Sequence, residues 1–285
     1  MTQARFPGTG LPGQRQSSPA GRMLASSCLG QGPAVVCLHG QPGSRADWAA
    51  VTELLSGEFT VVTLDRLGYG DTGGTAGGFA ANAAAVIVTM DHLGIDEAIV
   101  VGHSWGGAVA LALAGAHPHR VAGLVLVGST GPGDEPAWTD RLVALPVVGE
   151  VLVASTFAGA RALLTDPALR ALLEKFRPGI GPALSTIGPS RWGGRTAPWR
   201  AFVIDQRAYL DELADLVPTL DRVTAPCVVV VGSADRVVSP AVGAHLAATL
   251  ATATLRTVLG GGHLLALDHP DVVADAVRQV GFRSP

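Results

Sequence analysis

The stretch Val101-Gly102-His103-Ser104-Trp105-Gly106-Gly107 decides the fold of this chain. It follows the apolar run at residues 98–101 and precedes the alanine- and leucine-rich residues 108–113. A strand, a Gly-x-Ser-x-Gly turn and a helix in that order predict a sharp corner that presents the serine hydroxyl. We expect Ser104 to adopt strained backbone angles at this corner, because the flanking glycines are needed where side chains would collide with neighbouring backbone.

On both sides of this corner, short β-branched runs alternate with helical segments. The alternation predicts an α/β fold with a mainly parallel, doubly wound sheet that helices cover on both faces. The expected strands are Ala34–Leu38, Thr60–Leu64, 98–101, 123–127, 227–231 and about 254–259. The expected helices are 47–55, 80–93, Trp105–Ala116, 241–250 and 271–280.

The alternation stops after Val127 and resumes near Pro226. The proline-rich stretch between them has no clear strand, and three of its segments are typical of short helices, namely 161–164, 168–176 and 202–213. We therefore predict a core made of residues 31–128 and 219–285, interrupted by a helical cap insertion at residues 129–218. Residues 1–30 are rich in Gly, Pro and Ser and are expected to form an irregular N-terminal arm.

Composition excludes several classes of protein. With 48% hydrophobic and 15% charged residues, the chain is typical of a globular protein with a well-buried core. A net charge of −3 without a basic stripe argues against a nucleic-acid partner. There is no uncharged apolar segment of about 18 residues to span a membrane, and residues 1–30 lack the apolar region of a secretory signal. We expect a cytoplasmic protein with a small-molecule substrate, and buried, reduced thiols at Cys37 and Cys227.

Three side chains of complementary chemistry follow the carboxyl ends of predicted strands, where open α/β sheets place their sites. They are Ser104, Asp235 after the strand at 227–231, and His263 after three glycines that follow the last strand. This chain order matches nucleophile, acid and base on such an architecture. A serine hydroxyl needs a base within hydrogen-bond reach. We expect His263 to be that base and Asp235 to orient its imidazole.

A fourth feature is the small-residue loop at residues 39–44, which follows the strand Ala34–Leu38. Such a loop can direct backbone N–H groups toward a developing negative charge. We expect the N–H groups of Gln41 and Trp105 to form an oxyanion hole. The loss of one such donor typically costs about 10²–10³ in rate.

These motifs resemble those of the α/β-hydrolase superfamily, from Gly32 onward. The motifs that carry the resemblance are His39-Gly40-Gln41-Pro42-Gly43, Asp65-Arg66-Leu67-Gly68-Tyr69-Gly70-Asp71, Gly102-His103-Ser104-Trp105-Gly106-Gly107 and Gly262-His263. Together they are most similar to the capped esterase, lactonase and epoxide-hydrolase-like branch. The resemblance implies Ser104 as nucleophile, His263 as base and Asp235 as acid. Epoxide hydrolases and haloalkane dehalogenases carry aspartate where this chain has Ser104, so acyl transfer is favoured over alkyl-enzyme chemistry.

The acid has two alternatives. Asp134 follows the preceding strand but stands several residues beyond its end, and Asp268 is close in sequence to His263. Asp235 is favoured because it follows its strand directly. Asp65 and Arg66 follow another strand, and we interpret them as a structural ion pair or turn cap.

Four further residues are candidates for a substrate pocket. His39 and His103 flank the predicted site and are expected to act mainly as scaffold hydrogen-bond partners. Trp138 and Trp192 lie in the insertion, where each could line the pocket or pack the cap.

The sequence therefore predicts a serine hydrolase that cleaves an ester or similar acyl bond of a small, hydrophobic substrate through an acyl-enzyme. A lyase, cyclase or C–C bond hydrolase of the same fold is an alternative, although C–C hydrolases often have tryptophan where Leu264 follows His263. A small-molecule receptor that keeps the three side chains is another. No metal-ligand cluster or dinucleotide fingerprint is present, so neither a metal nor a cofactor is expected.

Overall fold

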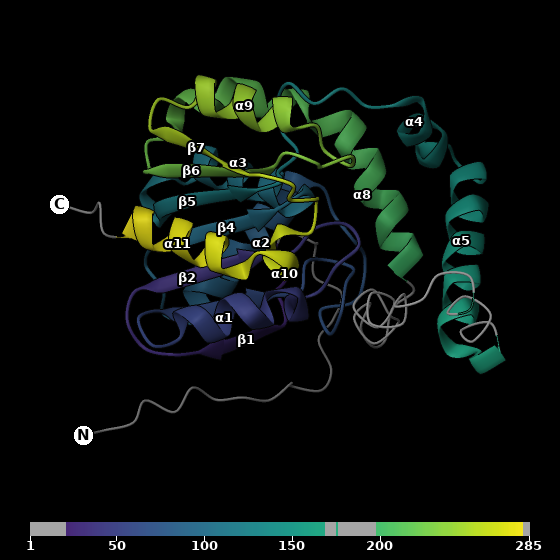
Figure 1. The fold of residues 1–285 in the computed structure, drawn as a ribbon, viewed down its shortest axis with the longest axis horizontal. Coiled ribbons are helices and arrows are strands. Elements are labelled where there is room, and N and C mark those ends of the chain that lie inside the picture. Colours follow the sequence, from purple (N-terminus) through teal and green to yellow (C-terminus); the bar gives the residue numbers. More distant parts are fainter. Residues whose placement is uncertain (1–20, 169–174, 176–197, 282–285) are drawn as a thin grey trace.

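A seven-stranded, mostly parallel sheet forms the centre of the molecule (Figure 1). The computed structural model describes residues 21–168, 175 and 198–281. The strands are β1 (Ser26–Leu29), β2 (Ala34–Leu38), β3 (Thr60–Leu64), β4 (Ala98–His103), β5 (Val121–Val127), β6 (Cys227–Gly232) and β7 (Ala253–Val258). Their order is β1-β3-β2-β4-β5-β6-β7, and only the β1–β3 pair is antiparallel. The predicted α/β class is confirmed.

Helices cover both faces of this sheet. On one face lie α1 (Ala49–Leu55), α10 (Leu265–Asp268) and α11 (Pro270–Gly281), and on the other lie α2 (Phe79–His92), α3 (Trp105–Ala116) and α9 (Pro240–Thr249). Two 3-10 helices, η2 (Arg45–Trp48) and η3 (Pro118–Arg120), precede α1 and β5. The expected core helices are present, with ends that differ by a few residues.

Two buried clusters explain why the central strands contain almost no polar residues. Successive side chains of a strand point to opposite faces. Thus Val35 and Cys37 of β2 pack beneath α1 and α11, whereas Val36 and Leu38 pack beneath α2 and α3. Since both faces are covered, every position along β2, β4 and β6 favours an apolar side chain.

The corner between β4 and α3 has the strained geometry that the sequence predicts. Ser104 has φ 53° and ψ −122°, a conformation that L-residues rarely adopt. A Cβ atom at Gly102 would overlap with the main-chain oxygen of Gly106, and one at Gly106 would overlap with that of Leu38. The two glycines thus allow α3 to start directly against the ends of β4 and β2.

The expectation of irregular structure up to residue 30 is wrong for Ser26–Leu29, which form the edge strand β1. All four residues are exposed, so the strand lacks the apolar alternation that identifies a half-buried strand in a sequence. Its register is set by pairing with β3, from Ser26 opposite Leu64 to Leu29 opposite Val61. Tertiary pairing therefore creates a strand that local sequence does not indicate.

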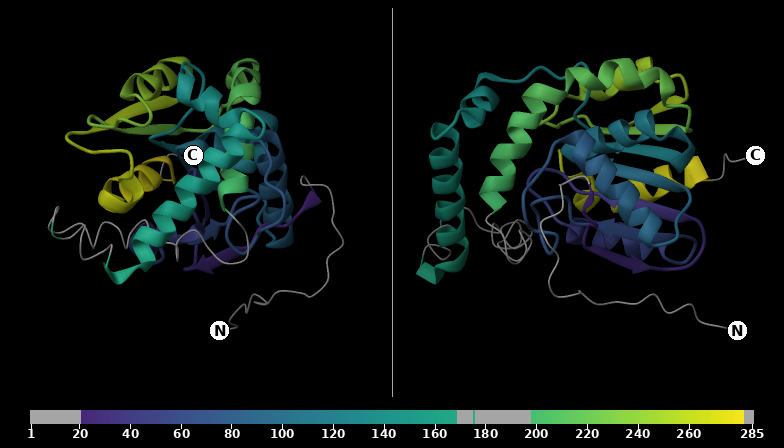
Figure 2. Two further views of the ribbon diagram at one scale, coloured as in Figure 1. Left: turned by 90° about the vertical axis from the view of Figure 1, so that its right-hand side faces the viewer. Right: turned by 180° about the vertical axis from the view of Figure 1, so that it is seen from behind.

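Between β5 and β6, the structure places helices and, within the described residues, no strand. These helices are α4 (Trp138–Ala144), α5 (Val148–Thr165), α8 (Pro198–Glu212) and η4 (Ala214–Arg222). Figure 2 shows α8 between the sheet layers and α5. The predicted boundary at residue 218 falls inside η4, whose Leu216 and Leu220 pack in the same cluster as α3.

The helices of this insertion were predicted only in part. Residues 161–164 are the end of α5, a much longer helix than expected, and residues 202–213 correspond to α8. The segment 168–176 lies almost wholly outside the described residues. The sequence does not indicate α4 and most of α5, because prolines flank α4 and β-branched residues are frequent in α5.

Among the described residues, no single helix has the length and apolar composition of a membrane span. One pair of helices reaches that length and composition when taken together, but the pair is bent by 99° at the break between Trp138–Ala144 and Val148–Arg161.

Replacing Gly102 by Ala should lower the free energy of unfolding by roughly 1–3 kcal/mol, because the added Cβ atom overlaps with backbone that cannot turn aside. Gly159→Ala is a matched control, since Gly159 lies in α5 with nothing within 4 Å of its Cβ position. Alanine there should stabilise the protein by about 0.5–1 kcal/mol. Urea unfolding of both variants measures the difference. Equal stability of G102A and the wild type would show that the corner tolerates a side chain.

Candidate active site

Ser104, His263 and Asp235 form one chain of hydrogen bonds at the carboxyl ends of the strands. Ser104 Oγ lies 3.0 Å from His263 Nε2, and His263 Nδ1 lies 2.8 Å from Asp235 Oδ2. The serine comes from the corner after β4, the aspartate from the loop after β6 and the histidine from the loop after β7. Each residue is separated from the others by more than twenty positions, so the parallel sheet alone brings them together.

The carboxylate of Asp235 is buried and fully engaged. Its Oδ1 accepts hydrogen bonds from the backbone N–H groups of Val237, at 2.8 Å, and Val238, at 3.1 Å. Burial by itself raises the pKa of Asp235, but the hydrogen bond and charge of His263 and the two backbone donors outweigh it and hold the pKa below its ordinary value. Asp235 is therefore ionised at neutral pH and holds Nδ1–H of His263 as a donor.

The structure gives the two alternative acids other surroundings. Asp134 accepts a hydrogen bond of 2.6 Å from Thr130 Oγ1 and, together with burial, raises the pKa of Tyr209 in α8. Asp268 lies at the end of α10. Within the described residues, neither carboxylate shares a hydrogen bond with His263.

The loop after β2 lies directly against Ser104. A Cβ atom at Gly40 would be 3.1 Å from Ser104 Cβ and 2.9 Å from His103 Nδ1. Only a glycine lets the backbone that leads to Gln41 come this close. The side chain of Gln41 donates through Nε2 to the main-chain oxygen of Phe202 in α8, at 2.7 Å, so this loop also contacts the insertion.

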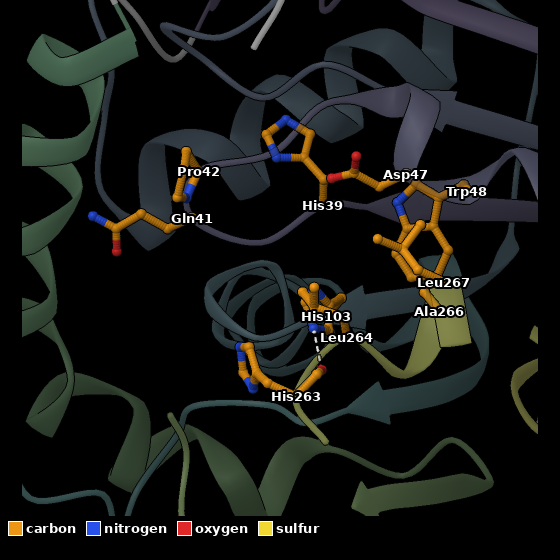
Figure 3. A pocket seen from close by; sticks show the side chains of 10 residues that line it. All are labelled: His39, Gln41, Pro42, Asp47, Trp48, His103, His263, Leu264, Ala266 and Leu267. Carbon is orange, nitrogen blue, oxygen red and sulfur yellow. Dashed lines mark hydrogen bonds between the residues drawn. The ribbon is translucent and has the colours of Figure 1, made fainter. Parts of the chain in front are cut away.

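His39 and His103 have the scaffold roles that the sequence favours. His39 Nδ1 donates to the oxygen of Gly40 at 2.8 Å, and Nε2 accepts from the backbone N–H of Arg66 at 3.0 Å. His103 Nε2 donates to the main-chain oxygen of His263 at 2.9 Å (Figure 3). Burial lowers the pKa of His39 well below its usual value and that of His103 to about 4. Both rings are therefore neutral and hold loops in place.

A cavity of about 60 Å³ lies between the loop after β2 and the loop that carries His263 (Figure 3). Of the four predicted pocket residues, His39 and His103 line it, together with Gln41, but its volume is far below the roughly 300 Å³ of a small ligand site. Trp138 is not among its lining residues and is 74% exposed. Trp192 lies outside the described residues.

Sequence reasoning missed the role of Asp205 in α8, which pairs with Arg66 after β3. Asp65 and Arg66 do form ion pairs, as interpreted, but with Arg45 and Asp205 and not with each other. One signal for Asp205 was available, since it shares a helix face with Ala201, Ala208 and Tyr209. An acid on the apolar face of a helix needs a partner when buried, yet the sequence does not say which.

The pH dependence of stability tests the buried, neutral state of His103. An unfolded histidine gains a proton below about pH 6.5, whereas native His103 gains one only near pH 4, so the free energy of unfolding falls as pH drops between these values. At about 1.4 kcal/mol per pH unit, this histidine contributes a loss of up to ~2 kcal/mol between pH 7 and pH 5.

His103→Gln keeps a donor near the Nε2 position but cannot titrate. Urea unfolding at pH 7, 6 and 5 should therefore give a shallower pH dependence for the variant than for the wild type. Identical slopes would mean that His103 has the same pKa in the folded protein as in the unfolded chain, as expected for a ring exposed to water.

Comparison with known proteins identifies relatives that include an esterase. The chain is 32% identical over 258 residues to a pimeloyl-[acyl-carrier protein] methyl ester esterase from Aromatoleum aromaticum, covering 87% of this chain and 98% of the relative. It is 35% identical over 170 residues to the dihydrolipoyllysine-residue acetyltransferase component of an acetoin cleaving system from Cupriavidus necator. That match covers 56% of this chain and only 44% of the relative.

A thermophilic esterase from Thermogutta terrifontis has a similar fold, with a TM-score of 0.69 and 24% sequence identity over 90% of this chain and 92% of the esterase. The model of the alpha/beta hydrolase family matches residues 35–276, which include β3 to β7 in full and all of β2 except Ala34. On this match, which spans most of the sequence, the chain belongs to the alpha/beta hydrolase family.

Proposed function

We propose that this protein is a serine hydrolase that cleaves an ester or similar acyl bond of a small, hydrophobic substrate through an acyl-enzyme. The observation that carries the proposal is the continuous chain of hydrogen bonds from Ser104 through His263 to Asp235, at 3.0 and 2.8 Å. These distances lie within the range that a nucleophile and its base require.

In the first half of the reaction, His263 Nε2 takes the proton of Ser104 while Oγ attacks the carbonyl carbon. The imidazolium that forms is stabilised by ionised Asp235, which remains ionised throughout. His263 then delivers the proton to the leaving group. Because Asp235 holds Nδ1–H as a donor, Nε2 is the nitrogen that is free to accept the proton.

Attack creates an oxyanion that needs preorganised donors. The backbone N–H groups of Gln41 and Trp105 are the proposed donors: Trp105 directly follows the nucleophile, and the Gly40–Gln41 loop lies against Ser104. Neither N–H makes a hydrogen bond to another described residue. In the second half, His263 activates water, which releases the acid from Ser104.

A hydrophobic substrate is supported by the insertion, which presents apolar side chains without burying them. Val151 of α5 is 62% exposed and Val147 is 67% exposed. The relative from Aromatoleum aromaticum is an esterase by name, which agrees with ester cleavage. Measuring kcat/KM for esters, lactones and amides of graded chain length will rank these substrate classes.

Replacing Ser104 by Ala should lower kcat for a p-nitrophenyl acyl ester by about 10⁴–10⁶-fold, because the attacking oxygen is lost. A fluorophosphonate probe should label the wild type with one equivalent, S104A not at all, and His263→Ala only slowly. Mass spectrometry of the labelled peptide identifies the modified residue. Full activity of S104A would rule out the serine mechanism.

Replacing Asp235 by Asn should lower kcat by about 10³–10⁴-fold, because the amide favours the wrong tautomer of His263. Asp134→Asn is the matched control, as the same change removes a carboxylate that does not contact His263. It should leave kcat within a few fold. Steady-state kinetics compare the two variants, and a larger loss for D134N would assign the acid to Asp134.

A further inference from the structure

A fully buried ion pair connects the insertion to the loop that carries Gln41. Arg66 follows β3, and Asp205 lies in the middle of α8; Arg66 Nη2 and Asp205 Oδ2 are 2.8 Å apart. Both side chains have no exposed surface. Tyr69 donates its hydroxyl to the same Oδ2, also at 2.8 Å.

Arg66 also holds two carbonyl groups of the loop after β2. Its Nε donates to the oxygen of His39 and its Nη2 to the oxygen of Gly40, both at 2.9 Å. A trans peptide unit is planar, and its C=O and N–H point in opposite directions. Fixing the oxygen of Gly40 therefore fixes the direction of the N–H of Gln41, which is the first proposed oxyanion donor.

The second proposed donor belongs to the same cluster. The guanidinium of Arg66 lies 4.2 Å from the ring centre of Trp105, in cation–π contact. Trp105 Nε1 donates to the main-chain oxygen of Asp205 at 3.2 Å. One residue of α8 thus contacts Arg66 and Trp105, the two residues that orient the proposed oxyanion hole.

This ion pair is not arranged for stability alone. In the part of the chain that the structure describes, Arg66 Nη1 and Asp205 Oδ1 have no hydrogen-bond partner although both are buried. The desolvation of two buried charges roughly cancels their attraction, so well-packed apolar residues often replace such pairs without loss of stability. A role in orienting the Gly40–Gln41 peptide would explain why the charges of Arg66 and Asp205 are buried here although stability does not require them.

We propose that Asp205 is a positioning residue of the oxyanion hole: by holding Arg66, it sets the direction of the Gly40–Gln41 peptide, so that the hole is complete only when α8 is packed on the core. The inference rests on the proposed acyl transfer and adds to it a requirement for the insertion. Asp205 acts through Arg66 and does not touch the substrate.

The test separates orientation from stability with three variants. Asp205→Asn removes the charge, and the double variant Arg66→Met/Asp205→Leu replaces the pair by apolar side chains of similar size. Glu150→Gln is the matched control, because Glu150 of α5 forms the ion pair of 2.9 Å with Arg207 of α8, at the surface of the same insertion. Urea unfolding measures stability, and the end point of fluorophosphonate labelling counts reactive sites.

We expect D205N to lower kcat per reactive site for a p-nitrophenyl ester by about 10–100-fold, less than the roughly 10²–10³-fold loss when an oxyanion donor is removed altogether, with KM changed less than about threefold. The double variant also removes the Arg66 donors from the oxygens of His39 and Gly40, so it should be less stable than the wild type but still folded, and it should keep the low kcat. The backbone amide resonance of Gln41 in a ¹⁵N–¹H spectrum should move in both variants. E150Q should match the wild type in every measurement.

A double variant with wild-type kcat and an unmoved Gln41 resonance would overturn the inference and leave the pair as a structural contact. A rise in KM at constant kcat would also overturn it, since Asp205 would then serve substrate binding. If the wild type neither hydrolyses esters nor reacts with the probe, the proposed function fails. In that case the Gln41 resonance alone decides whether Asp205 sets this peptide.

Discussion

The corner at Ser104 leaves no space for side chains on either side of the serine. Where α3 starts, the backbone passes so close to the ends of β4 and β2 that Cβ atoms at Gly102 and Gly106 would overlap with it. Ser104 itself accepts a φ of 53°. This strain holds its hydroxyl at the point where the loops after β2, β6 and β7 meet, and strained residues of this kind persist only where the surrounding structure determines them.

The ionisable groups around this corner differ in charge because burial and hydrogen-bond partners shift their pKa values in different directions. Asp235 stays ionised because His263 and two backbone donors stabilise its charge. His39 and His103 are neutral because burial dominates: the charge of Arg66 lowers the pKa of His39 further, and the Asp235 carboxylate raises the pKa of His103 too little to offset burial. The His39 ring fixes the carbonyl of Gly40 in its own loop, and the His103 ring fixes that of His263 in a neighbouring loop. His263 is thus the histidine whose two ring nitrogens contact both a hydroxyl and a carboxylate, which suits proton transfer between Ser104 and a leaving group.

The sequence predicted the structure correctly where a residue pattern is compatible with only one kind of secondary-structure element. The strands Ala34–Leu38 and Thr60–Leu64 match in full, because a short apolar run between turn residues in an α/β protein is a strand buried on both faces. It failed for β1, whose exposed residues are held only by pairing with β3. It also failed for α4, whose stability comes from packing against α5 and α8 and not from helix propensity.

The sequence alone determined the fold class, the serine at the corner, and the residues that follow the strand ends, because a parallel sheet brings the carboxyl ends of its strands to one edge whatever the loop lengths are. Only the tertiary structure decided that Asp235, and not Asp134, meets His263. It alone also paired Arg66 with Asp205, 139 positions away. Contacts between a loop and a separate helix depend on how the two elements pack, and no periodicity in the sequence encodes that packing.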